Sequence, residues 1–530
     1  MFRNMIHIRI LVLFVVLVSM TAILVFMPED GLYTVPIIAN KTIVVAAHDS
    51  PEEMKALATH VCDGTADQVE IQRALDALSQ TGGTVTLTGG TFHISDYLFV
   101  PGNVVFEGQG SDVTRLEWSS GFMRCDEDHI ELRDFTTTGT GAIWLRGISH
   151  VKVHNVVATV DASLYGAAFT LWVRDSIMED IEFLNCKAID CGRHGWMNDG
   201  MGSPKLIRNI RYIDCEAINC GRYSRFDHWT TGFDIAENSD IEDCEIIRCY
   251  AEGNWESGFH FEGAPSKKRV VLRDCVSKNN GQKPDDYYND NTATHGCLFG
   301  AGFWLHGDVT LINCTAGSNW RYGYAVWSPS TDIDPVDPGT GYQFDYVDTI
   351  GTSSEAAYRE YLDPGYQVQG GMIALCDCMS GGNGDAELPP MDSNTYLSRC
   401  IDDGSAIGFG LFRAHDAYLE DCASLNAGAY AIYAHEVSGI TVENLHMVNP
   451  TGVNGNGTFL GTIAQPVINS QFNIIGQIGA DVRAIYGEGG QDLTFTGVIR
   501  TDHPEPVIIR GGSDIDTSGL EILAGSEQGC

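Results

Sequence analysis

The chain has 530 residues, of which 44% are hydrophobic, enough to bury a large core. Its 70 acidic and 32 basic residues give a formal net charge of −38. This balance argues against nucleic acid or an anionic membrane surface as a partner, because both attract clustered Lys and Arg. It suits high solubility or salty surroundings, which we favour over a specific cation site.

The N-terminus combines a short basic segment, residues 1–9, with an uncharged apolar run from Ile10 to Met27. A run of this length can span a bilayer as a helix, and the basic end is expected to stay in the cytoplasm. A cleaved signal peptide is the alternative, but no small-x-small cleavage site precedes Pro28. The sequence therefore predicts an uncleaved single-pass signal anchor in the cell membrane, with the bulk of the chain extracellular.

A linker and first strand are expected over residues 28–59, and a capping element with the first coils over 60–115. The cap contains the run Cys62-Asp-Gly-Thr-Ala-Asp67, then Ile71-Gln72, then Gly82-Gly-Thr-Val-Thr-Leu87. Asp67 is predicted to N-cap a helix, since Asp is a preferred N-cap residue. One apolar stripe of that helix is expected to cover the end of a core; its members are Ile71, Ala74, Leu75 and Leu78.

This opening resembles that of the pectate-lyase-like superfamily: an Asp-Gly-x-x-Asp turn, a capping helix with Ile-Gln, and Gly-Gly-x-Val-x-Leu. The likeness is close over 60–115 and looser to about 500. It implies an all-β fold, a right-handed parallel β-helix of the bacterial or archaeal surface type. Such helices carry lyases, hydrolases, epimerases, phage spikes and adhesins, so the resemblance predicts the fold rather than an activity.

The chain repeats itself downstream of the cap. Segments beginning at Phe183, Tyr212 and Ile241 align without gaps, and their first cysteines are 29 residues apart. A unit of this length, with short strands and no amphipathic helix, is typical of one coil of a β-solenoid. We expect the β-helix over 116–440, followed by closing coils or a small C-terminal β cap over 441–530.

The cysteine that follows Asn or Asp in each repeat is expected to point inward at the same place on every coil. Cysteine is readily buried, which favours a ladder of free thiols. Disulfides are the alternative, because neighbouring coils lie about 4.8 Å apart. The spacing does not match a zinc site. The expected ladder comprises Cys186, Cys215, Cys244, Cys275 and Cys314.

Two insertions interrupt the repeat, at 279–296 and 328–397. The second contains three aspartates, Asp332, Asp334 and Asp337, which could hold Ca²⁺. A solvated loop is the preferred interpretation, because the spacing and terminal Glu of an EF-hand are missing. No other cofactor is expected, and the sequence does not indicate an oligomeric state.

A second repeated strand has the form Gly-aromatic-x-apolar-x. Strand side chains alternate between faces, so the two x positions are expected to face outward as an exposed ladder of two columns. The first column reads Thr170, Met197, Asp234, His260, Trp304 and Ala325. The second column reads Trp172, Asp199, Ala236, Glu262, His306, Trp327, Phe412 and Tyr433.

The ladder is predicted to bind polysaccharide through its aromatic rings and to act on it with its acids and histidines. A hydrolase needs two carboxylates. The backbone positions of Asp234 and Glu262 are expected roughly 8 Å apart, a separation that suits an inverting hydrolase. Asp199 and Asp234 are expected at the same separation. A lyase would instead use a histidine base and a cation. The catalytic candidates are Asp234, Glu262, His260, Asp199 and His306. The substrate-binding candidates are Trp172, Trp304, Trp327, Arg222, Arg225 and His228.

Known catalytic signatures of such helices are missing. The chain lacks the Asn-Thr-Asp and Arg-Gly-His tripeptides of polygalacturonase-like helices and the Asp-Pro-His-Glu motif of alginate epimerases. Packing of the ladder beneath the insertions therefore remains a real alternative to a working surface. The predicted function is an extracytoplasmic glycoside hydrolase or polysaccharide lyase; the alternative is a non-catalytic surface adhesin or envelope protein that binds glycan.

Overall fold

A computed structural model describes residues 41–160, 167–221, 230–236, 238–261, 266–281, 300–319, 322–327, 395–412, 414–452, 455–463 and 466–525. Residues from Asn40 onward form one compact unit. The predicted anchor at 10–27 lies outside the described residues, as does most of both insertions. None of the helices within the described ranges is long and apolar enough to cross a membrane.

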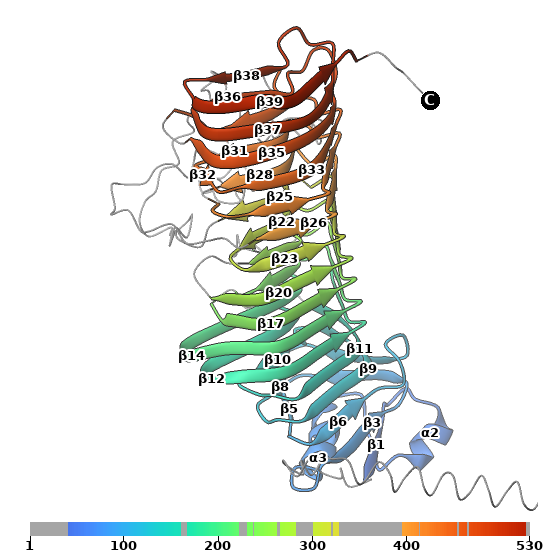
Figure 1. The fold of residues 1–530 in the computed structure, drawn as a ribbon. Coiled ribbons are helices and arrows are strands. Elements are labelled where there is room, and N and C mark those ends of the chain that lie inside the picture. The colour runs from blue at the N-terminus through green and yellow to red at the C-terminus, as the bar shows by residue number, and fades with distance from the viewer. Residues whose placement is uncertain are drawn as a thin grey trace, which may run out of the picture. The chain divides into compact units, whose positions relative to one another are not determined.

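The described strands form one sheet that coils on itself, and each coil pairs in parallel with the next (Figure 1). This confirms the predicted all-β fold and the parallel β-solenoid. Each coil has three faces. The first, here called the ladder face, is built from β5 (Leu98–Val100), β8 (Met123–Cys125), β10 (Ile143–Arg146), β12 (Phe169–Leu184), β14 (Trp196–Ile213), β16 (Phe233–Ile235), β19 (Phe259–Phe261), β22 (Ala301–His306), β25 (Tyr322–Trp327), β28 (Ile407–Phe412), β31 (Tyr430–His435), β34 (Thr458–Leu460), β36 (Ile485–Glu488) and β38 (Val507–Arg510).

The other two faces complete each coil, and long strands bend from one face to the next. The second face contains β1 (Thr42–Ala46), β2 (His60–Val61), β3 (Gly83–Leu87), β6 (Val104–Glu107), β9 (Ile130–Gly139), β11 (Val151–Val160), β17 (Asp240–Ile247), β20 (Lys267–Arg273), β23 (Val309–Ile312), β26 (Tyr396–Ser398), β29 (Tyr418–Glu420), β32 (Val437–Ser438), β33 (Thr441–Val448), β35 (Val467–Gln477), β37 (Gly490–Arg500) and β39 (Ser513–Leu523). The third contains β4 (Gly90–Ile94), β7 (Thr114–Trp118), β13 (Lys187–Ile189), β15 (Glu216–Ile218), β18 (Tyr250–Glu252), β21 (Val276–Lys278), β24 (Thr315–Gly317), β27 (Ile401–Asp403) and β30 (Ala423–Leu425).

On ten coils, the corner between the second and third faces is turned by a single residue in the left-handed region. Asn and Asp tolerate this conformation better than other residues with side chains. Their amides and carboxylates also bond along the stack: the Nδ2 of Asn185 donates to Asn155 at 2.8 Å, and that of Asn155 to Asp134 at 2.9 Å. Ten residues at this corner, with φ between 51° and 62°, are Asp134, Asn155, Asn185, Asp214, Arg248, Asp274, Asn313, Arg399, Asp421 and Asn444.

The residue after each corner points into the core, as predicted, and seven of these are buried, unbridged cysteines. The column is Cys186, Cys215, Cys249, Cys275, Cys314, Cys400 and Cys422. Cys244 is not in it, so the predicted register of the third repeat is wrong. Tyr250 pairs with Glu216, which sets Cys249 beside Cys215, and Cys244 pairs with Ile210. The step between these two coils is 34 residues instead of 29, which a gapless alignment cannot represent.

A ladder of buried asparagines runs inside the helix where the third face meets the ladder face. Asn254 donates from both its backbone N and its Nδ2 to Oδ1 of Asn280, at 3.1 and 2.9 Å. Asn280 donates in the same way to Asn319, and the backbone N of Asn319 donates to Oγ of Ser405 at 3.2 Å. Buried polar groups are tolerated only when they are hydrogen-bonded. Here the side-chain oxygen of one asparagine accepts from the backbone N and Nδ2 of the asparagine on the preceding coil.

The N-terminal end is covered by α3 (Gln68–Asp76), preceded by the short helix α2 (Glu52–Leu57). The predicted apolar stripe of α3 is confirmed, because Ile71, Ala74, Leu75 and Leu78 are all fully buried. Asp67 occupies the N-cap position of α3, as predicted, but its side chain makes no cap bond to the helix. Its carboxylate instead accepts from the backbone N of Gly64 at 2.9 Å and of His93 at 2.7 Å, which ties the turn to β4.

The last coils continue the same parallel pairing, β33 with β35, β35 with β37 and β37 with β39. The described strands between residues 441 and 525 therefore continue the coils of the β-helix.

Candidate functional site

The predicted columns lie on the ladder face. In the first column Thr170 pairs with Met197, Met197 with Asp234, Asp234 with His260, and His260 with Trp304. The neighbouring positions Phe233, Phe259 and Phe303 belong to the core, so the column residues point away from it. The second column also aligns, Trp172 with Asp199 and His306 with Trp327.

One member of the second column was placed wrongly. Tyr433 pairs with Gly410, which puts it in the first column, and His435 pairs with Phe412 in the second. The core position of β31 is occupied by Ile432, opposite Phe409. The prediction places Tyr430 at the inward aromatic position of the repeat, but Ile432 occupies that position in the structure.

The predicted exposure of the ladder is wrong at its centre. Asp234, His260 and Trp304 are only 2–3% exposed, and His306 is 7% exposed. Alternation decides on which face a side chain leaves the strand, but not whether distant parts of the chain cover that face. The centre of the ladder is thus a covered layer.

Three buried polar side chains meet on successive coils at this centre; we call His194, Asp234 and His260 the polar cluster. Oδ2 of Asp234 lies 3.4 Å from Nδ1 of His194. The backbone N of Thr231 donates to the same Nδ1 at 3.1 Å, so this nitrogen carries no proton and the proton of the neutral ring is on Nε2. Burial, reinforced by Arg193 and His260, holds the pKa of His194 well below its usual range. The contact is therefore not an ion pair.

An aromatic residue borders the cluster on the next coil. The ring of Trp304 stacks on His260 with centroids 5.9 Å apart and planes 13° apart, and it lies 5.9 Å from the ring of His306. Asp199 is held rigidly, since its Oδ1 accepts from the backbone N of Gly200 at 2.7 Å and from Nδ2 of Asn238 at 3.0 Å. The catalytic roles predicted for Asp234, His260, Asp199 and His306 remain predictions.

Several predicted site residues lie outside the described residues: Glu262, Arg222, Arg225, His228 and the side chain of Trp327. The distance between the carboxylates of Asp234 and Glu262, the proposed catalytic pair, therefore stays a prediction. Of the described carboxylates, Asp199 and Asp234 stand on adjacent coils in different columns, as predicted.

The ladder face is open at its N-terminal end, where the sequence pattern gave no signal. Phe99 pairs with Arg124, and Arg124 with Trp144, which extends the first column by three coils below Thr170. Each sits between two inward apolar residues, as in Ile143-Trp144-Leu145, without the Gly that marks the later repeats. Tyr97 and Phe99 are 44% and 46% exposed, in contrast to the covered centre.

Four rings at this end form what we call the aromatic platform: Tyr97, Phe99, Phe122 and Trp144. Phe122 stacks on Trp144 at 4.8 Å between centroids, and Tyr97 meets Phe122 edge-on at 4.8 Å. Phe122 and Trp144 are half-buried against the core. The platform is therefore both held in place from beneath and reachable from solvent.

A hollow of about 540 Å³ lies away from the ladder face, between the turn at Gly64–Ala66 and strands β4 and β7. Its charged groups satisfy one another: Glu117 lies 2.8 Å from Nε of Arg115 and 3.6 Å from Nδ1 of His93. One carboxylate is too few for a two-carboxylate hydrolysis. This hollow is not the predicted site.

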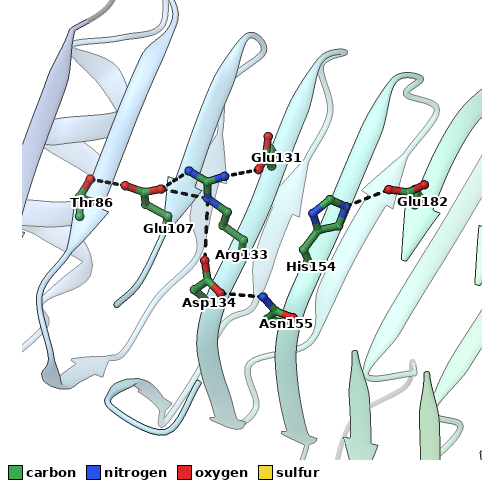
Figure 2. Close-up of polar contacts among 8 residues, drawn as sticks. All are labelled: Thr86, Glu107, Glu131, Arg133, Asp134, His154, Asn155 and Glu182. Atoms are coloured by element: carbon green, nitrogen blue, oxygen red, sulfur yellow. Dashed lines mark hydrogen bonds and ion pairs between the residues drawn. The ribbon is translucent and has the colours of Figure 1, made fainter. Parts of the chain in front are cut away.

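A charged network covers part of the second face (Figure 2). Arg133 donates to Glu107 from Nε at 2.9 Å and to Glu131 from Nη1 at 2.7 Å, while His154 lies 3.0 Å from Glu182. The hydrogen bond with Glu107 raises the pKa of Arg133. Opposite charges alternate from coil to coil, which is the arrangement that stabilises neighbouring strands. We interpret this network as structural.

Within the described residues, Cys62, Asp67 and Glu70 are the one group of three potential metal ligands close together. Both carboxylate oxygens of Asp67 already accept backbone N–H groups. Burial, with the nearby Asp67 and Glu70, raises the pKa of the Cys62 thiol, so it keeps its proton. The group does not fit a metal site. The aspartates considered for Ca²⁺, at 332–337, lie outside the described ranges.

No protein-family model and no curated protein matches the chain. Solved structures with a similar fold include gene product 12 of bacteriophage phi29, at 13% identity and a TM-score of 0.46, over 88% of this chain. The chain spans 56% of the length of that protein. The mannuronan C-5 epimerase A-module of Azotobacter vinelandii matches at 12% identity, over 87% of this chain and 96% of its own, with a TM-score of 0.35. A surface adhesin of Streptococcus pneumoniae matches at 10%, over 85% and 89%, with a TM-score of 0.40. Likenesses this distant decide nothing about activity.

Proposed function

We propose that this chain is a polysaccharide-binding β-helix protein that holds glycan at the open N-terminal end of its ladder face. The observation that carries the proposal is the aromatic platform, in which Tyr97 and Phe99 are exposed and Phe99 and Trp144 continue the first column of the ladder. Exposed aromatic groups of this size usually mark a binding surface. Their flat faces match the apolar faces of pyranose rings, and their packing against the core limits the entropy lost on binding.

Catalysis at the polar cluster is the second candidate, as hydrolase or lyase. Burying an Asp and two His costs free energy that an apolar core would not, and such groups concentrate at functional sites. In this candidate the neutral His194 holds Asp234 in position, and His260 acts as the general acid or base.

Binding and cleavage are separable in one experiment. The full chain is mixed with a panel of insoluble polysaccharides, and both depletion of the protein and release of reducing or unsaturated ends are measured. We expect retention on at least one glycan. If cleavage occurs, Asp234→Asn and His260→Gln should abolish it while retention persists. Retention without products excludes the enzyme, and a panel that retains nothing excludes the proposed function.

We also propose that the chain works outside the cytoplasm, held by residues 10–27. Support comes from the charge-free apolar run behind a basic end. The full chain should sediment with membranes and resist extraction by carbonate, whereas a chain that lacks residues 1–27 should be released. A mature protein whose mass shows loss of this segment would favour the cleaved signal peptide instead.

A further inference from the structure

The aromatic platform carries two arginines as well as its rings. Arg124 stands in the first column between Phe99 and Trp144, and Arg146 stands beside Trp172 in the second. The guanidinium carbon of Arg124 lies 5.6 Å from the centre of the Phe99 ring. The cation and the aromatic faces therefore belong to one continuous surface.

The two arginines share a single carboxylate. Nη2 of Arg124 lies 2.6 Å from Oδ2 of Asp126, and Nη1 of Arg146 lies 3.8 Å from its Oδ1. Among the described residues no other acid pairs with either arginine. Both side chains are about one third exposed, at 34% and 35%. Two guanidinium groups thus share one carboxylate partner, which leaves them donors for a bound anion, although Glu127 and Asp128 follow next in the sequence.

The spacing of charge and rings matches a sugar polymer better than a compact anion. Guanidinium groups bind carboxylate or sulfate oxygens in a fork, and rings on neighbouring coils offer stacking faces in succession. We infer that Phe99, Arg124, Trp144 and Arg146 form a subsite for an anionic polysaccharide, one that bears carboxylate or sulfate groups. This inference rests on the proposed function and adds to it the charge of the glycan and the place where it binds.

Three polymers with one backbone test the inference on the full chain: dextran, carboxymethyl dextran and dextran sulfate, compared by affinity electrophoresis at low and physiological salt. We expect the anionic polymers to bind about tenfold or more tightly than dextran, with the difference shrinking as salt rises. The carboxymethyl and sulfate arms show which acid group is preferred.

Substitutions locate the subsite. Arg124→Gln should remove most of the preference for anionic polymers, so that the ratio of their affinity to that of dextran falls toward one. Arg115→Gln is the matched control, because Arg115 pairs with Glu117 at 2.8 Å on the third face as Arg124 pairs with Asp126. Trp144→Ala should weaken all three polymers by about tenfold, and Trp144→Phe, which keeps an aromatic face in the same packing, should restore most of the binding.

The outcomes separate this inference from the proposed function. Equal binding of dextran and its anionic derivatives, or an equal effect of Arg115→Gln, overturns the subsite while glycan binding stands. Loss of all binding by the wild type overturns both. Single-stranded DNA also combines stacking rings with negative charge; tighter binding of an oligonucleotide than of dextran sulfate would replace the glycan by nucleic acid.

Discussion

Replacing Asp402 with asparagine is expected to abolish a loss of stability that the wild-type protein undergoes as the pH rises from about 4 to about 8. Asp402 lies in β27 and occupies an inward position where the coil before has Ala316 and the coil after has Ser424. Burial raises the pKa of its carboxyl to about 8, although Ser405 opposes the shift. Neither oxygen has a hydrogen bond of normal geometry.

The direction follows from proton binding. The folded pKa is raised, so between the unfolded value near 3.8 and about 8 the folded protein holds a proton that the unfolded chain has lost. The contribution is complete below the unfolded pKa and is lost as the pH passes through the folded one. The full effect is on the order of 5 kcal/mol. Urea denaturation at a series of pH values measures it.

Asp402→Asn should match the wild type at about pH 3, below the unfolded pKa, and exceed it increasingly as the pH rises to about 9. Asp402→Ser introduces the residue found at the paired position of the next coil, Ser424, and its stability should likewise not fall with rising pH. Asp403→Asn is the control, because this neighbouring carboxylate is exposed and accepts from Asn426 at 2.9 Å. A wild-type stability that does not fall over this range would show that the pKa of Asp402 is not raised in the fold, and a slope that survives in Asp402→Asn would assign the pH dependence to other groups.

Replacing Asn280 with alanine is expected to destabilise the protein by about 3 kcal/mol. The substitution removes the acceptor of the backbone N and Nδ2 of Asn254, leaving both donors buried, and it removes the donor to Asn319. It also opens a small cavity in a layer that is fully buried. The midpoint of urea unfolding, with hydrogen exchange at the amide of Asn254, reports the change.

Asn280→Ser provides a graded comparison. Ser405 already serves as the last rung, with its Oγ accepting from the backbone of Asn319. A serine at position 280 should therefore keep an acceptor for Asn254 and lose clearly less stability than alanine. Equal losses for serine and alanine would mean that packing, rather than the hydrogen-bond ladder, supports this layer.

Much of the fold was predictable from local pattern. The cap was recognisable because the stripe from Ile71 to Leu78 follows the helical period, and the inward cysteines because each follows a residue that turns a corner. The asparagine ladder was missed. Asn254, Asn280 and Asn319 lie at unequal intervals in the sequence, and only the stacking of coils brings them together.

For the candidate site, the sequence predicts the register of the first column but not the burial of its centre or the residues that lie beside it. The register from Thr170 to Trp304 follows from the repeated Gly-aromatic strand. His194 was missed because it precedes that motif, and its neighbour Asp234 comes from the next coil. Phe99, Arg124 and Trp144 were missed because their strands lack the glycine that made the later repeats visible.

Most inward and outward positions followed from the sequence, because alternation along a strand and the left-handed preference of Asn and Asp are local properties; β31 and the third cysteine repeat are the exceptions. Tertiary structure alone decided three things: that Cys249 rather than Cys244 continues the thiol column, that Asp234 and His260 are covered, and that the aromatic platform is open. Register depends on the length of chain between coils, and exposure depends on what packs across a face. Both involve residues distant in the sequence.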